Sequence, residues 1–329
     1  MSGLMVRVPH RVSISGGSTD FPDYFREHGG VVVSAAFKKY IYVMVNETVE
    51  HQGYEIHNNG EHEFSLNVND IKNDIVRAVL DRYGCPPGTK ITINSELPQG
   101  CGLASSSALT VALIMAMSKI RGLSFTQYEL SLEAIHIESD VCKRQTGWQD
   151  QFGVTYPGVK KIVFGMNKEY DLPYAYVETI FKPNVHFASN MFLVYTGKTR
   201  DSVKLLAKQK ENIQANIERL DKIKSLTDET VDQLKAQYTN WDVVGRNLSI
   251  NWNLKKELAD GINNTNVDNL YSKGIAAGAS GGKLMGAGSG GFLLFVVPPM
   301  YQMEFVQLMN GYAKMPVIVD SEGPKLWEL

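Results

Sequence analysis

Residues 97–109 read LPQGCGLASSSAL, and this stretch decides the fold because it joins a strand to a helix. Upstream, residues 90–95 alternate apolar and polar side chains, as half-buried strands do. Pro98, Gly100 and Gly102 then end the strand in a loop. From Ala104 to Met117 small and apolar residues continue without a breaker, which favours a buried helix over another strand.

Ser105, Ser106 and Ser107 stand where this helix is expected to begin, and the arrangement predicts an anion site. A helix start has unpaired backbone N–H groups and a partial positive charge. The glycines before it allow a phosphate to approach the backbone closely. Serine hydroxyls can donate to phosphate oxygens or bind Mg²⁺. They can also simply cap the helix, but three in a row exceed what one cap needs, so we expect phosphate binding.

Composition limits the kind of protein. The chain has 329 residues, 43% of them hydrophobic, which suits one large domain or two ordinary ones. A net charge of −2 gives no electrostatic reason to bind nucleic acid or a membrane surface. We find neither an apolar run of transmembrane length nor a signal-peptide core, and the three cysteines lack metal-type spacing. We therefore expect a soluble cytoplasmic protein.

Strand and helix patterns occur in mixed order, so the expected class is α+β. Near Pro183 the pattern restarts, and we place a domain boundary there. The predicted strands are residues 5–15, 31–36 and 39–45 (a hairpin or meander), 54–56, 63–66, 90–95, 162–164, 176–180, 191–195, 292–297 and 316–320. The predicted helices are residues 71–83, 104–117, 125–144, 201–224, 228–258, 267–278 and 301–312, with a polar loop over 146–153.

Two segments carry carboxylates suited to chemistry. Residues 16–20 read GGSTD after the first strand, and Asp20 can accept hydrogen bonds from two hydroxyls of a polyol. Asp20 and Ser18 can equally bond their own turn. Asp150 is the only carboxylate in residues 147–151, where Trp148 precedes it, although a loop aspartate often makes only an Asx turn. Glu138 lies late in a helix, where a glutamate usually belongs to a solvated face.

A second glycine-rich segment lies near the C-terminus, where residues 283–291 read KLMGAGSGG. Its Gly-x-Gly-x-x-Gly pattern leads into a strand, whereas a dinucleotide-binding fingerprint opens a helix. A tight turn before a strand remains the plain alternative. Between a strand and a helix, Lys198 and Arg200 are placed either to hold a substrate phosphate or to form a solvated helix start.

The pattern Pro98-x-x-x-Gly102-Leu103-x-Ser105-Ser106 resembles the nucleotide loop of the GHMP kinases. Segments at the N-terminus and near the C-terminus resemble the family's other motifs, in the right order. The resemblance implies an N-terminal domain like ribosomal protein S5 over residues 1–183 and a ferredoxin-like C-terminal domain over 184–329. It places the active site in the cleft between them, with ATP and Mg²⁺ as cofactors.

The resemblance also implies roles for individual residues. Asp150 would be the catalytic aspartate and Arg11 would sit at the phosphoryl-transfer centre; His10 stands where the family usually has glycine. Glu138 and Ser106 would hold Mg²⁺, with Ser105 and Ser107 as alternatives. The nucleotide would contact Pro98, Gly100, Cys101, Gly102, Leu103, Ala104, Ser105, Ser106 and Ser107. The substrate would contact Gly17, Ser18, Thr19, Asp20, Trp148, Lys198, Arg200 and Gly288.

These motifs resemble a sugar 1-kinase branch, which holds D-glycero-D-manno-heptose 7-phosphate kinases and fucokinases. We therefore expect ATP-dependent phosphorylation of the anomeric hydroxyl of heptose 7-phosphate to the 1,7-bisphosphate. A fucokinase-like sugar 1-kinase and a catalytically silent sugar-binding regulator remain alternatives, and an NAD-linked oxidoreductase is the weakest. The expected partner is a small sugar or sugar phosphate, with the protein a monomer or homodimer.

Overall fold

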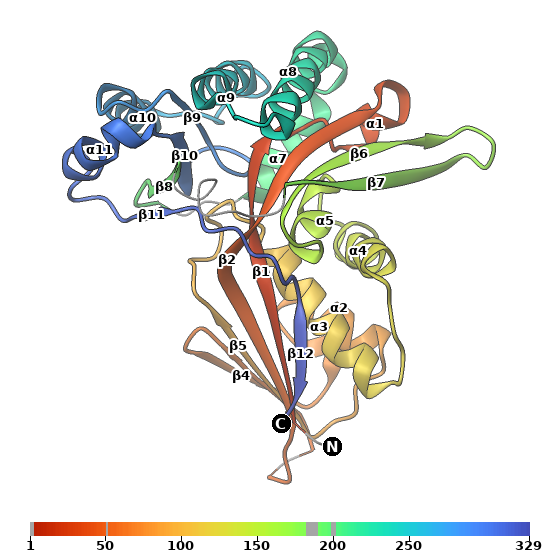
Figure 1. The fold of residues 1–329 in the computed structure, drawn as a ribbon. Helices are drawn as coiled ribbons and strands as arrows, with labels where there is room; N and C mark the ends of the chain where they lie inside the picture. Colours follow the sequence, from red (N-terminus) through yellow and green to blue (C-terminus); the bar gives the residue numbers. More distant parts are fainter. Residues whose placement is uncertain (1–2, 51, 182–189, 199–201) are drawn as a thin grey trace.

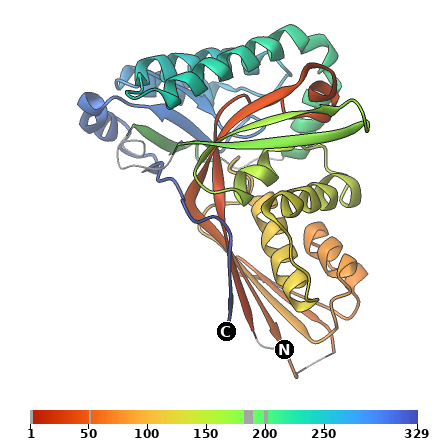
Figure 2. The same cartoon turned by 45° about the vertical axis from the view of Figure 1, so that its right-hand side comes forward.

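The computed structural model describes residues 3–50, 52–181, 190–198 and 202–329, and it confirms the α+β class. Two sheets organise these residues, and a long pair of strands, β1 and β2, runs through the molecule toward the helices at its far end (Figures 1 and 2). The expected boundary at 183/184 lies in residues 182–189, outside the described residues.

The larger sheet has the order β12-β1-β2-β5-β3-β4, and β6 extends it from β2 to β7. Its strands are β1 (Leu4–Ser15), β2 (Gly30–Glu47), β3 (Tyr54–Asn58), β4 (Glu61–Ser65), β5 (Thr89–Ser95), β6 (Val159–Asn167), β7 (Leu172–Phe181) and β12 (Lys325–Glu328). The smaller sheet has the order β11-β8-β10-β9, with β8 (Met191–Tyr195), β9 (Gly281–Leu284), β10 (Phe292–Val296) and β11 (Lys314–Pro316).

The helices fall into two groups. Along the larger sheet lie α1 (Pro22–His28), α2 (Asp74–Arg82), α3 (Ser105–Ile120), α4 (Gln127–Ile135), the π-helical turn η2 (His136–Val141) and α5 (Gln149–Thr155). The second group is α7 (Ser202–Glu211), α8 (Ile217–Lys235), α9 (Trp241–Lys256), α10 (Thr265–Ala276) and α11 (Gln302–Leu308). Short 3₁₀ turns cover residues 68–70, 214–216 and 299–301. No helix among the described residues is long and apolar enough to cross a membrane.

Helix α3 is the centre of the larger core. It lies against β1 and β2 on one side and against α2, α4 and α5 on the others, with Val111, Leu113 and Ile114 fully buried. Because the helix is surrounded, it needs no polar face, which explains its continuous apolar sequence. The predicted strand-loop-helix unit is confirmed as β5 followed by α3.

The expected hairpin over residues 31–45 is wrong, because β2 is one continuous strand. Its first half pairs with β6 and its second half with β5. Opposite Pro9, the register with β1 slips, so that Pro9 faces Tyr40 while His10 faces Phe37. Proline cannot donate a ladder hydrogen bond. Lys38 and Lys39, at the gap between the two predicted strands, therefore form a bulge within one strand.

Further boundaries differ in the C-terminal half. Residues 228–258, expected as one helix, form the end of α8 and the whole of α9, since the Asn240 side chain accepts from the N–H groups of Asp242 and Val243 and caps a new helix. Similarly, the predicted helix 201–224 is split between α7 and α8. The predicted last strand 316–320 is wrong beyond its first residue: Pro316 ends β11, and Val319 makes an isolated bridge to Phe37. The last strand is β12, which the sequence does not predict.

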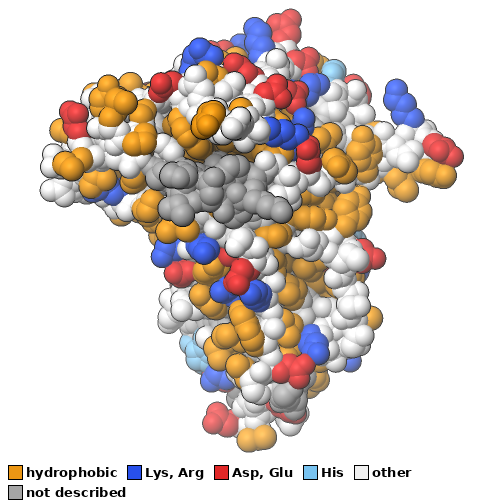
Figure 3. Space-filling view, in the orientation of Figure 1, with side chains coloured by type: hydrophobic (Ala, Val, Ile, Leu, Met, Phe, Trp, Pro, Cys, Tyr) orange, Lys and Arg blue, Asp and Glu red, His pale blue; other side chains and the backbone are white. Residues whose placement is uncertain are grey.

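Apolar packing joins the two sheets. One core cluster contains Val12 and Ile14 of β1 together with Leu193 and Leu294 of the smaller sheet and Leu248 of α9. The surface is mixed in charge, with acidic and basic side chains interspersed over the face in Figure 3. This agrees with the small net charge of the chain.

The buried helix α3 gives a stability prediction. Leu113→Ala should lower the free energy of unfolding by about 2–5 kcal/mol, because it removes fully buried methyl groups and leaves a cavity. Leu123→Ala, just beyond the helix and 52% exposed, is the matched control and should cost under about 1 kcal/mol. Chemical denaturation of both variants measures the difference, and equal losses would contradict this account of the core.

Candidate active site

A cavity of about 280 Å³ lies between elements of both halves of the chain. It collects many of the residues that the motifs singled out. Those that line it are Arg11, Gly17, Ser18, Asp20, Gly100, Gly102, Ala104, Ser105, Ser106, Glu138 and Asp150. From the C-terminal half come Leu206 and Gln209 of α7, Lys255 of α9, Lys283 of β9, and Gly286 and Ala287 after β9.

The glycine-rich loop has a backbone suited to an anion. Positive φ angles alternate along it, at 69° for Gly100, 83° for Gly102 and 64° for Ala104. Alternation of this kind makes concave nests of backbone N–H groups that bind anions. Ala104 is the N-cap of α3 and makes no side-chain cap, so none of the serines caps this helix. The plain capping alternative is therefore wrong.

Other residues of the glycine-rich loop pack into the core and do not face the cavity. Cys101 and Leu103 are fully buried in the core that also holds β1 and the smaller sheet. Pro98, Cys101, Leu103 and Ser107 do not line the cavity. A Cβ on Gly291 would lie 2.2 Å from the carbonyl oxygen of Cys101. The C-terminal glycine segment thus packs against the loop backbone.

Arg11 and Asp150 form a partly buried ion pair at the cavity wall. Arg11 Nε and Nη2 donate to Asp150 Oδ1 at 3.0 and 2.7 Å, while Nη1 donates to the carbonyl of Gly102 at 2.8 Å. The Arg11 side chain is 2% exposed and that of Asp150 is 27% exposed. Both bonds to the carboxylate use Oδ1, so Oδ2 is left for a ligand in the cavity.

Asp150 lies in the first turn of α5, so the expected polar loop over 146–153 is wrong in its second half. The helix begins there because Asp20 accepts from the N–H of Gln149 at 3.1 Å through its second carboxylate oxygen. A Cβ on Gly147 would meet that oxygen at 2.0 Å, which explains the glycine. Asp20, the candidate for sugar binding, therefore holds the start of the helix that carries Asp150, the catalytic candidate.

Asp20 bonds its own turn and also lines the cavity. Its Oδ1 accepts from the N–H of Ser18 at 3.0 Å, as a turn aspartate does, yet its side chain also lines the cavity. Burial and the nearby charge of Asp150 raise the pKa of Asp20. Ser18 donates to Gln209 of α7 at 3.3 Å, which links this turn to the C-terminal half.

Glu138 has the environment of a cation ligand. The π-helical turn η2 carries it, and π-helical turns are frequent at functional sites. The side chain is 1% exposed, and burial raises its pKa to about 7 against the opposing hydrogen bond from Ser107. That bond spans 3.2 Å to Oε2, while Oε1 makes no hydrogen bond of normal geometry among the described residues.

A buried, underbonded carboxylate oxygen beside serine hydroxyls fits Mg²⁺, a hard cation that prefers oxygen ligands. Ser105, Ser106 and Glu138 all line the cavity, whereas Ser107 is occupied with Glu138 and lies outside it. Ser106 with Glu138 therefore remains the predicted pair of ligands.

Several other predicted site residues lie elsewhere. Thr19 is buried and bonds the carbonyls of Gly16 and Val31. Trp148 packs edge-on against Phe25 at 5.1 Å between ring centroids, in a core outside the cavity lining. Gly288 lies against Ile262, and Lys198 is exposed. Arg200 lies outside the described residues.

Two lysines that sequence reasoning did not assign to the site line the cavity. Lys283, on β9, is 1% exposed, and its ammonium has no hydrogen-bond partner among the described residues. Burial, with the charges of Lys255 and Arg11, lowers its pKa, while Asp20 opposes that shift. Lys255 is also buried and donates to the carbonyl of Gly286. Lys283 opens the C-terminal glycine motif, and this was the available signal.

Comparison with known proteins gives matches in both halves of the chain. The family model for the GHMP kinases N terminal domain matches residues 69–158, and the model for the GHMP kinases C terminal matches residues 230–307. The D-glycero-alpha-D-manno-heptose 7-phosphate kinase of Campylobacter jejuni is 24% identical over all of both chains. The bifunctional fucokinase/GDP-fucose pyrophosphorylase of Arabidopsis thaliana is 25% identical over 95% of this chain and 32% of its own length.

A solved structure has the same fold. The crystal structure of a D-glycero-D-manno-heptose 1-phosphate kinase from Bacteroides thetaiotaomicron superposes with a TM-score of 0.77 at 24% identity, covering 99% of each chain. Because the superposition covers almost all of each chain, the similarity in fold includes both sheets.

His10, which lies beneath the glycine-rich loop, gives a pH prediction. Its ring nitrogens lie 3.3 Å from the carbonyl of Leu103 and 3.4 Å from Ser95 Oγ. Burial lowers the pKa of His10 from 6.5 to about 4. Between these values the unfolded chain binds a proton that the folded chain does not, so stability should fall as the pH drops from about 6.5 to about 4.

His10→Gln should flatten this fall by at most about 3 kcal/mol, because glutamine does not titrate. Urea unfolding at a series of pH values measures the difference between the two proteins. An identical pH dependence in both would show that His10 is not buried in its neutral form.

Proposed function

The chain belongs to the GHMP kinases, and on that premise we propose that it transfers the γ-phosphoryl group of ATP to the anomeric hydroxyl of a sugar phosphate. D-glycero-D-manno-heptose 7-phosphate is the proposed acceptor and the 1,7-bisphosphate the product. The observation that carries the proposal is the partly buried Arg11–Asp150 pair beside the nest of backbone N–H groups in the glycine-rich loop. A fixed cation and a carboxylate next to a phosphate cradle are what phosphoryl transfer needs.

The nucleotide loop supplies the first part of the mechanism. Its backbone N–H groups and the start of α3 hold the phosphates of ATP, with the hydroxyls of Ser105 and Ser106 in reach of the cavity. When bound at Ser106 and Glu138, Mg²⁺ would neutralise charge on the phosphates. Arg11 adds a fixed positive charge, and its hydrogen bond to the carbonyl of Gly102 holds the guanidinium in place relative to the loop.

Asp150 orients the acceptor. Its Oδ1 is held by Arg11, and Oδ2 accepts the hydrogen bond of the sugar hydroxyl that attacks the γ-phosphorus. A new P–O bond forms to the sugar oxygen as the bond to the β,γ-bridging oxygen breaks, and the hydroxyl proton passes to Asp150. Because the transition state of phosphoryl transfer is loose, orientation of the hydroxyl contributes more than early proton removal.

Other residues of the cavity lining suit a phosphorylated sugar. Asp20 accepts hydrogen bonds from sugar hydroxyls, and the ammonium of Lys283 lies within electrostatic reach of Asp20 and of Lys255. A buried ammonium without a hydrogen-bond partner is costly unless an anion pairs with it. We therefore assign the substrate phosphate to Lys283 and Lys255. Lys198 and Arg200 remain the alternative from the sequence.

A neutral acceptor is the second candidate, favoured by the similarity to the Arabidopsis fucokinase over 95% of this chain. It would leave the Lys283 charge unpaired, which is why we rank it lower. A catalytically silent regulator would not need the Arg11–Asp150 pair and the buried Glu138 together.

The role of Asp150 is testable by substitution. Asp150→Asn keeps the shape of the side chain but weakens its pairing with Arg11 and removes its capacity to take the proton, so kcat should fall about 100-fold or more. Asp140→Asn, an exposed carboxylate on η2, is the control and should keep full activity. Product mass after incubation with ATP and heptose 7-phosphate measures turnover. An Asp150→Asn variant of full activity would remove this residue from the mechanism.

The phosphate assignment predicts a split between substrates. The wild-type protein should prefer heptose 7-phosphate over the unphosphorylated heptose by about tenfold or more in kcat/KM. Lys283→Met should abolish that preference by raising KM for the sugar phosphate alone, since only this acceptor carries the charge.

Lys198→Met is the matched control, because Lys198 is an exposed lysine outside the cavity lining. If Lys198→Met rather than Lys283→Met erases the preference, the phosphate binds at the loop after β8. If the wild-type protein prefers unphosphorylated sugars, the neutral-acceptor alternative holds.

A further inference from the structure

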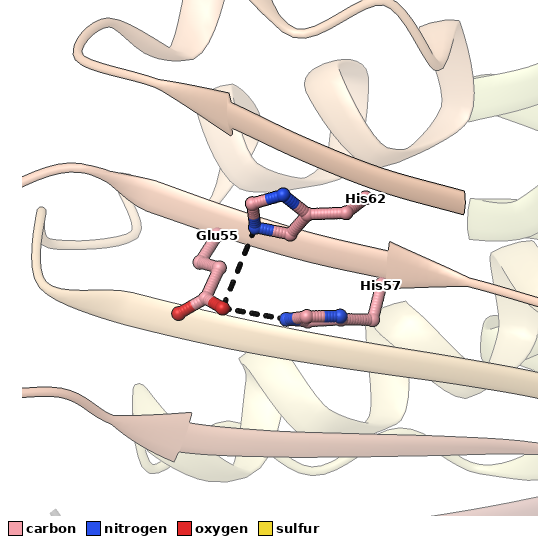
Figure 4. Close-up of side chains that lie close together, drawn as sticks. All are labelled: Glu55, His57 and His62. Carbon is pink, nitrogen blue, oxygen red and sulfur yellow. Dashed lines mark hydrogen bonds and ion pairs between the residues drawn. The ribbon is translucent and has the colours of Figure 1, made fainter. Parts of the chain in front are cut away.

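The hairpin formed by β3 and β4 gathers two imidazoles around one carboxylate. His57 and His62 are directly opposite in the antiparallel pairing of the hairpin. Glu55 is two residues before His57 and therefore on the same face of the sheet. Figure 4 shows the three side chains pointing toward one another, with the ring of His62 reaching across from β4.

The ligand atoms are close enough to share one ion. Glu55 Oε1 lies 2.5 Å from His57 Nε2 and 3.5 Å from His62 Nε2. One ligand atom from each of the three residues lies within 4.8 Å of the others. Ligands of a tetrahedral zinc ion stand roughly 3.3 Å apart at bond lengths of about 2.0–2.2 Å. Small side-chain rotations would reach that geometry, and the rings have room because His62 is 55% exposed and His57 36% exposed.

We propose that Glu55, His57 and His62 form a binding site for a divalent transition-metal ion of the zinc class. Two imidazoles and a carboxylate are ligands that Zn²⁺, Co²⁺ and Ni²⁺ accept, whereas Mg²⁺ and Ca²⁺ prefer all-oxygen sets. Three protein ligands leave at least one coordination position for water. An ordinary hydrogen bond between His57 and Glu55 would explain the position of one imidazole ring only. The ring of His62 also lies near the same oxygen, Glu55 Oε1, as a second metal ligand would.

Lys90 of β5 is the built-in competitor for this site. Its ammonium donates to Glu55 Oε1 at 3.1 Å, so it supplies the positive charge at that oxygen when no ion is bound. The Lys90 side chain is 38% exposed and can turn toward solvent when a metal ion displaces it. A divalent ion carries twice the charge of the ammonium and binds all three groups at once.

The site is distinct from the proposed catalytic centre. None of its three residues lines the active-site cavity. The inference therefore does not rest on the proposed function. One hydrogen bond links the hairpin in space to the glycine-rich loop, because Asn58 at the end of β3 accepts from Gln99, which does line the cavity.

Metal binding tests the proposal directly. The full-length chain, purified without a polyhistidine tag and free of nucleotide, is dialysed against Zn²⁺, and bound zinc is measured per chain. One tightly bound zinc ion per chain is expected. His57→Ala and His62→Ala should each weaken binding about tenfold or more, since each removes a ligand. Lys90→Met should tighten binding, because it removes the competing ammonium.

Two controls locate the ion. His136→Ala removes a histidine that has one carboxylate partner, Asp140 at 2.9 Å, and it should bind zinc as the wild type does. Glu138→Gln should also keep the bound ion, which separates the hairpin from the proposed Mg²⁺ site. Circular dichroism and Co²⁺ absorption spectra establish that each variant is folded and how its metal is bound.

Either of two results would overturn the proposal. The first is that the wild-type chain binds no zinc at micromolar concentration. The second is that a double variant, His57→Ala with His62→Ala, retains the wild-type affinity for zinc. Loss of zinc from Glu138→Gln with retention in the double variant would place the ion in the cavity instead.

Discussion

The buried guanidinium of Arg11 is the interaction on which the rest of the site depends. It bonds Asp150 on α5 and the carbonyl of Gly102 in the glycine-rich loop, while the backbone N–H of Arg11 donates to the carbonyl of Leu103. One cation thus fixes β1, the loop and α5 relative to one another. Breaking such a pair leaves a charge without compensation in a dry environment, so the arrangement is strongly enforced.

The cavity contains more charge than a structural core would hold. Arg11 is paired with Asp150, but the Lys283 ammonium has no hydrogen-bond partner among the described residues, and Glu138 is buried with one underbonded oxygen. These groups cost stability in the absence of ligands. Ligands of opposite charge that pair with these groups would stabilise the folded chain. The residues that lower the stability of the free protein are therefore the same residues that would bind the ligands.

Local sequence patterns predicted the helices and strands whose bounds depend on nearby residues. They failed where contacts with distant parts of the chain set the bounds. The β5–loop–α3 unit followed from alternation, glycines and an unbroken apolar run. The continuous strand β2 did not, because Lys38 and Lys39 form a bulge that depends on the pairing with β1 at Pro9. The start of α9 depends on the Asn240 cap, at a position that the helical periodicity places inside one helix.

The sequence by itself determined the nucleotide loop and the identity of Arg11, Asp20, Glu138 and Asp150 as candidates, because glycine spacing and family motifs are local properties. Only the tertiary structure decided that Trp148 and Thr19 belong to the packing, that Lys283 faces the cavity, and that His57 and His62 meet across a hairpin. Those outcomes depend on which side chains distant in sequence are brought together. Strand register and sheet order set that proximity, and no short pattern encodes it.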